Sequence, residues 1–140
     1  MAGSLTNYWE DKIINLFFGS TAHTPAATMY FALSSTDFTE AGTGGTEPST
    51  GSYARKDIAN TKAALWTTCS GGGAIENNAA ITFVTATADW LAGVNIGYWA
   101  IFDALTAGTC LAYGSMTTAK PVLNGDTATI AIGDLDITIT

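Results

Sequence analysis

Few side chains in this sequence could carry out chemistry. His23 is the only histidine, and no G-x-S-x-G motif supplies a nucleophile for it to activate. Cys69 and Cys110 lack both the C-x-x-C spacing and the neighbouring histidines that a zinc site requires. We therefore predict no catalytic residue, no metal site and no bound cofactor, and we expect the two cysteines to be free, buried thiols.

Carboxylates are the second possible source of chemistry. Two of them on opposite sides of a cleft can hydrolyse a glycosidic bond. Asp37, Glu40 and Glu47 fall in one long polar loop, and Asp103 follows an apolar run. Their spacing defines no pair across a cleft. We interpret the loop acids as solvated, and we expect Asp103 to cap the turn after it through its side chain. A small hydrolase would need activity that depends on His23 or Asp103.

Four tryptophans could form a platform for a sugar ring. They are Trp9, Trp66, Trp90 and Trp99. Trp99 lies in a strongly apolar run, so we assign it and Trp66 to the core. Trp90 falls in the connection 87–93, which makes it the best candidate for an exposed aromatic residue that binds a glycan.

Composition narrows the possible partners. The chain has 140 residues, a net charge of −7 and a pI of about 4.2. Such a surface repels phosphate groups, so we expect no nucleic-acid partner. No run of about 18 apolar residues occurs, so we also expect no membrane partner. Only 12% of residues are charged. A surface of short neutral side chains suits permanent packing against other chains, and it also suits an ordinary all-β protein.

The chain is organised around a predicted hairpin in Val94–Met116. Its apolar runs, Ile96–Phe102 and Cys110–Met116, are joined by a short polar connection with a glycine. The first run has large apolar side chains at both odd and even positions. A strand with one wet face would alternate instead. We therefore predict a central strand covered on both faces, which requires a second layer.

Alternating apolar residues predict further short strands, with polar turns between them. This pattern indicates an all-β protein: a jelly-roll-like antiparallel β-sandwich with one N-terminal α-helix. We predict residues 1–6 as a flexible N-terminal arm and residues 7–140 as a single β-sandwich domain that includes the helix. The strands expected outside the hairpin are 28–34, 53–58, 64–68, 80–85, 127–132 and 135–140. Turns are expected at 70–73 and 120–126.

The predicted helix is Asn7–Phe18. Asn7 could cap it, Glu10 stands three residues later as in a capping box, and Gly19 would end it. Its apolar residues leave two alternatives open. The helix could close one end of the sandwich, or part of it could dock on a neighbouring chain. The apolar positions that share one helical face are Trp9, Ile13, Leu16 and Phe17.

The loop 36–51 is the second expected contact region. It is long, polar and rich in glycine, and a loop of this length in a compact domain is usually functional or mobile. The interface residues predicted from sequence are Tyr8, Trp9, Ile13, Asp37, Glu40, Glu47 and Trp90.

Four segments together resemble a family of small tailed-bacteriophage virion structural proteins, whose members are often labelled tail-fibre or minor structural proteins. The likeness covers most of the chain in the same order. Each segment alone is weakly specific, and their combination is more so. The segments are Leu5–Gly19, Thr28–Arg55, Ala79–Phe83 and Ala100–Ala104, which include ALSSTD, EPS, GSYAR and IFDA.

The resemblance implies a non-enzymatic virion component, made in the host cytoplasm. A tail-fibre shaft normally shows repeats or heptads, which this chain lacks. We therefore expect a head decoration (cement) protein that stabilises the capsid by bridging capsomers on its outer surface. Its partners would be the major capsid protein and itself, as a homotrimer. The alternative is a tail or fibre-tip protein that binds a host-surface glycan.

Overall fold

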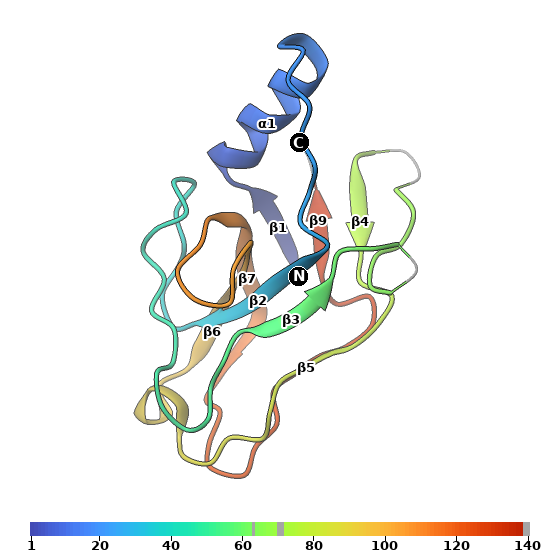
Figure 1. Cartoon of the computed structure of the whole chain (residues 1–140). Coiled ribbons are helices and arrows are strands. Elements are labelled where there is room, and N and C mark those ends of the chain that lie inside the picture. The colour runs from blue at the N-terminus through green and yellow to red at the C-terminus, as the bar shows by residue number, and fades with distance from the viewer. Residues whose placement is uncertain (63, 70–71, 139–140) are drawn as a thin grey trace.

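The fold is an arrangement of two sheets and one projecting α-helix. The computed structural model describes residues 1–62, 64–69 and 72–138, and Figure 1 shows a strongly curled main sheet with α1 extending from one end. The seven-stranded sheet has the order β3-β2-β6-β7-β1-β9-β4, and β5 pairs with β8 in a small second sheet. The predicted all-β class with one N-terminal helix is confirmed.

The described helices and strands have the following bounds. The main sheet contains β1 (Ala2–Leu5), β2 (Thr28–Ser34), β3 (Lys56–Ala59), β4 (Ala74–Glu76), β6 (Ile96–Phe102), β7 (Cys110–Lys120) and β9 (Asp136–Thr138). The remaining elements are α1 (Asn7–Phe18), β5 (Ile81–Thr82), the 3-10 segment η1 (Trp90–Gly93) and β8 (Thr129–Ile130).

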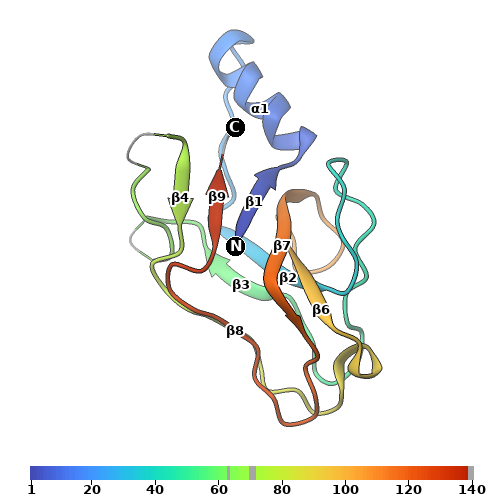
Figure 2. The ribbon, with the colours of Figure 1, turned by 180° about the vertical axis from the view of Figure 1, so that it is seen from behind.

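The predicted central hairpin is confirmed as β6 and β7. β6 lies between β2 and β7, and six of its seven residues are buried. The connection turns back through Ala107 and Gly108, which both have positive φ. The Thr109 backbone N–H donates to Asp103 Oδ1 at 2.6 Å, so the predicted capping role of Asp103 is confirmed. Figure 2 shows the two strands from behind.

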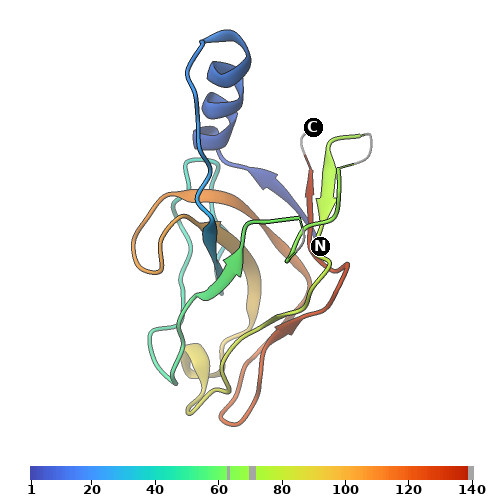
Figure 3. The ribbon, with the colours of Figure 1, turned by 45° about the vertical axis from the view of Figure 1, so that its right-hand side comes forward.

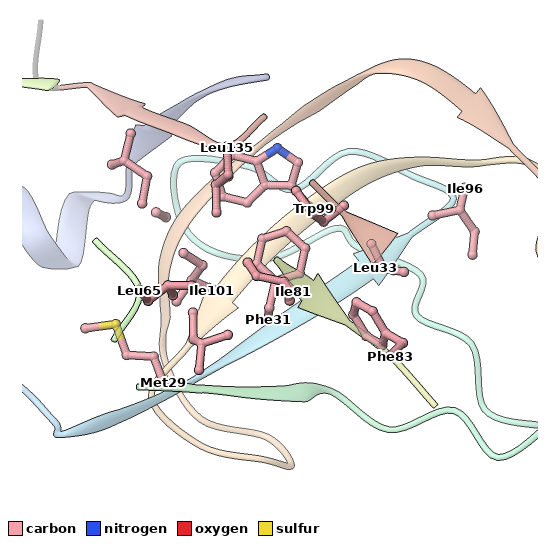
Figure 4. Close-up of a cluster of buried hydrophobic side chains, with 14 of the residues drawn as sticks. Met29, Phe31, Leu33, Leu65, Ile81, Phe83, Ile96, Trp99, Ile101 and Leu135 are labelled. Carbon is pink, nitrogen blue, oxygen red and sulfur yellow. The ribbon is translucent and has the colours of Figure 1, made fainter. Parts of the chain in front are cut away.

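The two faces of β6 are covered in different ways. On one face, Phe31 stacks on Trp99 with ring centroids 5.6 Å apart, and Ile81 and Ile130 of the small sheet complete this core. Figure 4 shows Phe31, Trp99 and Ile81 close together. On the other face, Ala100 and Phe102 belong to a smaller buried cluster. The second layer expected from sequence is therefore a small sheet on one side and other chain segments on the opposite side.

The loop 36–51 supplies that opposite cover. Its Phe38 is buried and packs against Phe102, with ring centroids 5.8 Å apart. Ser34 Oγ donates to the Thr36 carbonyl and accepts from the Thr46 backbone N–H. The loop is thus held in place by packing and hydrogen bonds, and its sequence length reflects a structural role.

The flexible arm predicted for residues 1–6 is wrong, because Ala2–Leu5 forms β1. It pairs antiparallel with β7 and parallel with β9, so the sheet is mixed. Gly3 lies directly over Trp99: a Cβ added there would approach the indole ring to 2.3 Å. The short strand was missed because glycine and serine carry no apolar alternation, while its partners lie more than a hundred residues away.

Several predicted strands are shorter than the sequence pattern indicates. The ladders cover Lys56–Ala59, Ile81–Thr82 and Thr129–Ile130, and Trp66 makes only an isolated bridge with Asn77. The strand β4 has no counterpart among the strands predicted from the sequence. Apolar alternation reports which side chains face inward, whereas a strand additionally requires a hydrogen-bonding neighbour. The ends of two predicted segments, 70–71 and 139–140, lie outside the described residues.

Candidate interaction surface

The helix α1 begins and ends where the sequence predicts, but its N-terminal cap differs. Thr6, not Asn7, is the N-cap residue, and no side-chain hydrogen bond caps the helix. The predicted capping box with Glu10 is therefore wrong. Thr6 is buried, and its hydroxyl donates to the Cys110 carbonyl at 2.7 Å, while its backbone N–H donates to the Leu111 carbonyl. This side chain joins the helix base to β7.

Aromatic contacts hold the base of α1 against the body. Tyr8 and Trp9 are half-buried and pack on the main core. Trp9 meets the His23 ring edge-on, with centroids 4.9 Å apart, which attaches the segment that follows the helix. Lys12 Nζ lies 5.2 Å from the Tyr8 ring centroid. His23 therefore has a packing contact, and Tyr8 and Trp9 are engaged within their own chain.

The far end of α1 projects into solvent. None of its twelve residues, all of them described, is buried. Phe17 is 74% exposed and Phe18 84% exposed, and Ile14 and Leu16 are also exposed. Figure 3 shows the helix standing clear of both sheets. It does not close one end of a sandwich, because its last two turns have no sheet beneath them. Docking on another chain stays a prediction.

The acidic residues of the loop 36–51 lie in different surroundings. Asp37 and Glu40 are exposed. The Glu40 carbonyl accepts the Asn7 backbone N–H at 3.1 Å, so this part of the loop lies beside the base of α1. Asp37 lines a shallow hollow with Ser4 and Tyr113. Asp37 and Glu40 therefore remain accessible to a partner, and the prediction of solvated loop acids is confirmed for these two residues.

Glu47 is engaged within the chain, so the prediction that it is a solvated loop acid is wrong. Both of its carboxylate oxygens accept from Arg55, at 2.6 Å from Nη2 and 3.0 Å from Nε. The Arg55 guanidinium lies 3.5 Å from the Phe102 ring centroid and donates to the Ala104 and Ala107 carbonyls. A bidentate, stacked arginine of this kind holds its neighbours in one geometry. The cluster fastens the loop 36–51 to the β6–β7 connection.

Tyr53 completes this cluster. Its hydroxyl lies 3.0 Å from Glu47 Oε2 and accepts the Leu33 backbone N–H. Burial, and next the neighbouring Glu47 carboxylate, raise the pKa of the Tyr53 phenol well above its ordinary value. The phenol therefore stays neutral and donates its proton within the cluster.

The exposed aromatic residue predicted at Trp90 is wrong. Trp90 is fully buried, and its Nε1 donates to the Gly51 carbonyl at 2.9 Å. It packs edge-on against Tyr53 and Phe83. The next residue, Leu91, has a left-handed backbone conformation. The chain changes direction there, while the Trp90 indole stays in the core. A glycan platform cannot form at this residue. Trp66 and Trp99 are buried, as predicted.

The remaining chemical groups are dispersed. Among the described residues, no three histidine, cysteine or acidic side chains gather in a way that could hold a metal ion. Cys110 and Cys69 are both free. Cys110 is buried, and burial raises the pKa of its thiol to about 12. Cys69 is exposed, so the expectation of two buried thiols holds for Cys110 and is wrong for Cys69.

A cleft lies beside β7 and β8 on the body of the molecule. Its volume is about 630 Å³. Four threonines, Thr117, Thr118, Thr127 and Thr129, line it together with Lys120, Asp126, Asp134 and apolar residues. No sequence motif marks this site, because threonine is common in strands and its spacing does not show which side chains line a hollow. The threonine-rich runs were the available signal.

The described residues thus form a β-rich protein with a hydrophobic projection, a cleft lined by hydroxyl groups and dispersed titratable groups. None of the described helices is long and apolar enough to cross a bilayer. Over residues 4–138 the chain matches the family described as "Podophage GP4 fiber I protein gp80", and it belongs to that family. The resemblance to phage virion structural proteins is therefore confirmed. No curated protein matches the chain.

Proposed function

We propose that this chain is a structural component of a podophage tail fibre and that it works by binding, without turning over a substrate. The observation that carries this proposal is the family match, which spans residues 4–138 and names a fibre protein. The dispersal of His23, Asp103 and the loop acids supports the non-enzymatic part. An acid–base mechanism would need such groups within hydrogen-bond reach of one reacting atom.

The family description favours a fibre over the head decoration role that the sequence analysis preferred. That preference rested on the lack of a repetitive shaft. A compact chain of 140 residues can serve at one end of a fibre whose shaft is another protein. Binding to the major capsid protein and assembly as a homotrimer stay predictions.

Localisation tests the proposal. An antibody against this chain, carrying gold, would be applied to intact particles of the phage that encodes it. We expect gold at the tail fibres. Labelling confined to the head surface would overturn the fibre assignment and support decoration. Particles purified away from free protein, with no trace of the chain by mass spectrometry, would overturn a virion role altogether.

A second candidate function is binding of a host glycan in the cleft beside β7. The four threonine hydroxyls and Lys120 offer donors and acceptors suited to a polyhydroxylated ligand. The candidate glycan site is therefore this cleft and not Trp90, because a buried indole cannot contact a glycan. A glycan array probed with the purified chain would test this candidate. Thr118→Val should abolish a genuine signal, whereas Thr67→Val should leave it unchanged.

A further inference from the structure

The outer face of α1 combines bulky apolar residues with two carboxylates. Ile14, Phe17 and Phe18 are spaced i, i+3 and i+4, so they are neighbours on the helix surface. Phe17 borders the stripe that begins at Trp9, but it lies about two turns beyond the point where Trp9 packs on the body. Glu10 and Asp11 stand three to four residues before Ile14 and lie on the same side, nearer the helix base. All five residues are exposed.

This face is presented by an ordered base. Thr6 ties the start of α1 to β7, the Trp9–His23 contact holds the returning segment, and the Gly19 backbone N–H donates to the Asn15 carbonyl at the far end. A phenylalanine side chain can bury about 150–250 Å² of surface. Phe17 and Phe18 leave most of this surface exposed to solvent. An apolar helix end held out from the body in this way is suited to insertion into a partner's groove.

Charge and size argue against a second copy of this chain as the occupant. Two copies packed with parallel helices would bring Glu10 and Asp11 of each against those of the other. Antiparallel packing would press the same carboxylates against Phe17 and Phe18. Both arrangements desolvate acids without a cation, in a chain whose net charge is already −7. Two helical turns also offer less than the roughly 800 Å² per partner of a standard flat interface.

We propose that α1 is an anchor that inserts Ile14, Phe17 and Phe18 into an apolar groove of another virion protein, with lysine or arginine at the mouth of that groove facing Glu10 and Asp11. This inference rests on the proposed function, since the partner belongs to the particle. It moves the predicted contact from Tyr8, Trp9 and Ile13, which are half-buried, to the exposed apolar residues towards the far end of the helix.

The test uses particles of the encoding phage assembled without this chain, through a nonsense mutation in its gene. Purified full-length chain is added back, and the amount that sediments with the particles is measured. For Phe17→Ser with Phe18→Ser we expect binding to fall by roughly tenfold or more, as for the loss of central anchor residues. Val84→Ser with Ile132→Ser, at exposed apolar positions off the helix, should bind like the unaltered chain.

The charge requirement is tested separately. Glu10→Gln with Asp11→Asn should weaken binding and reduce its sensitivity to salt, because exposed charge pairs are screened by ions. Asp57→Asn with Glu76→Gln removes the same charge elsewhere and should have no such effect. Circular dichroism of each variant would establish that α1 and the sheet remain folded.

Each outcome decides a different point. If the helix variants bind as well as the unaltered chain, the anchor is refuted while the fibre proposal stands. If the unaltered chain forms an oligomer that Phe17→Ser with Phe18→Ser dissociates, a second copy is the occupant and the inference is overturned. If the unaltered chain neither binds the depleted particles nor occurs in complete ones, the proposed function fails as well.

Discussion

At the residue scale, the side chains that could interact with a partner differ from those that hold the fold together. Trp90, Glu47 and Asp103 attract attention in the sequence as binding or catalytic candidates. In the structure each has an internal partner: a backbone carbonyl, the Arg55 guanidinium or a backbone N–H. Among the described large apolar residues, Phe17 and Phe18 have the highest exposed fractions.

Trp90→Ala should destabilise the chain severely. The substitution removes a fully buried indole and leaves the Gly51 carbonyl without its donor. Replacements of this kind typically cost about 3–5 kcal/mol of unfolding free energy. Urea denaturation followed by intrinsic fluorescence would measure the loss. A stable Trp90→Ala chain that has merely lost a glycan ligand would contradict the buried position.

Arg55→Ala should release the loop 36–51 from the β6–β7 connection. Arg55 is 9% exposed at its side chain, and its removal leaves Glu47 partly buried without a cation. Breaking such a pair costs about 3–5 kcal/mol when it is fully buried, and less here because Glu47 is partly solvated. Limited proteolysis should then cut within the loop. Lys56→Ala, whose charge is exposed, serves as the control, and equal cutting of both variants would count against the cluster.

At the element scale, β1 explains how the projecting helix is supported. The strand lies between β7 and β9 and ends at Leu5, one residue before the N-cap Thr6. The direction of α1 is therefore set by a strand inside the main sheet. The loop 36–51 has a similar supporting role, because Phe38 covers the outer face of β6 and Glu40 contacts the helix base.

Gly3→Ala tests the close approach of β1 to the core. An added Cβ would meet the Trp99 ring at 2.3 Å and the Tyr113 carbonyl at 2.7 Å. Overpacking of this kind costs roughly 1–3 kcal/mol, and more where backbone cannot move. Thermal denaturation should show a lower midpoint for Gly3→Ala and little change for Ser4→Ala, its exposed neighbour. An unaltered midpoint would mean that β1 does not cover Trp99.

At the scale of the whole molecule, the core is aromatic and contains groups that must stay uncharged. Tyr53 joins the main hydrophobic core and Cys110 the smaller cluster on the other face. The two residues therefore lie in separate buried clusters. Burial raises the pKa of the Tyr53 phenol and the pKa of the Cys110 thiol. Their ionisation would place a charge inside the folded chain.

The unfolding free energy should fall as the pH rises from about 9 towards 12. In the unfolded chain a thiol ionises with a pKa of about 8.5 and a phenol with a pKa of about 10. In the folded chain the pKa of Cys110 is about 12. Between these values the unfolded state binds fewer protons, so each group contributes a decline of up to about 1.4 kcal/mol per pH unit. Below about pH 7.5 both groups are almost fully protonated in the folded and the unfolded chain, so they contribute almost no slope.

Urea denaturation at a series of pH values would measure this decline. Cys110→Ala should be less stable at neutral pH but should show a shallower fall between pH 9 and pH 10, where the thiol is the first of the two groups to act. Cys69→Ala, at an exposed thiol, is the matched control. Identical slopes for both variants and the unaltered chain would show that Cys110 is solvated.

The sequence by itself determined the local and periodic features: the bounds of α1, the central hairpin, the turn cap at Asp103 and the all-β class. These depend on neighbours a few residues apart. The family resemblance also followed from the sequence. Tertiary structure decided the remainder, including the incorporation of β1, the burial of Trp90 and the engagement of Glu47. Thr6 and Cys110, which join helix and sheet, are 104 residues apart, and no local pattern encodes a contact at that separation.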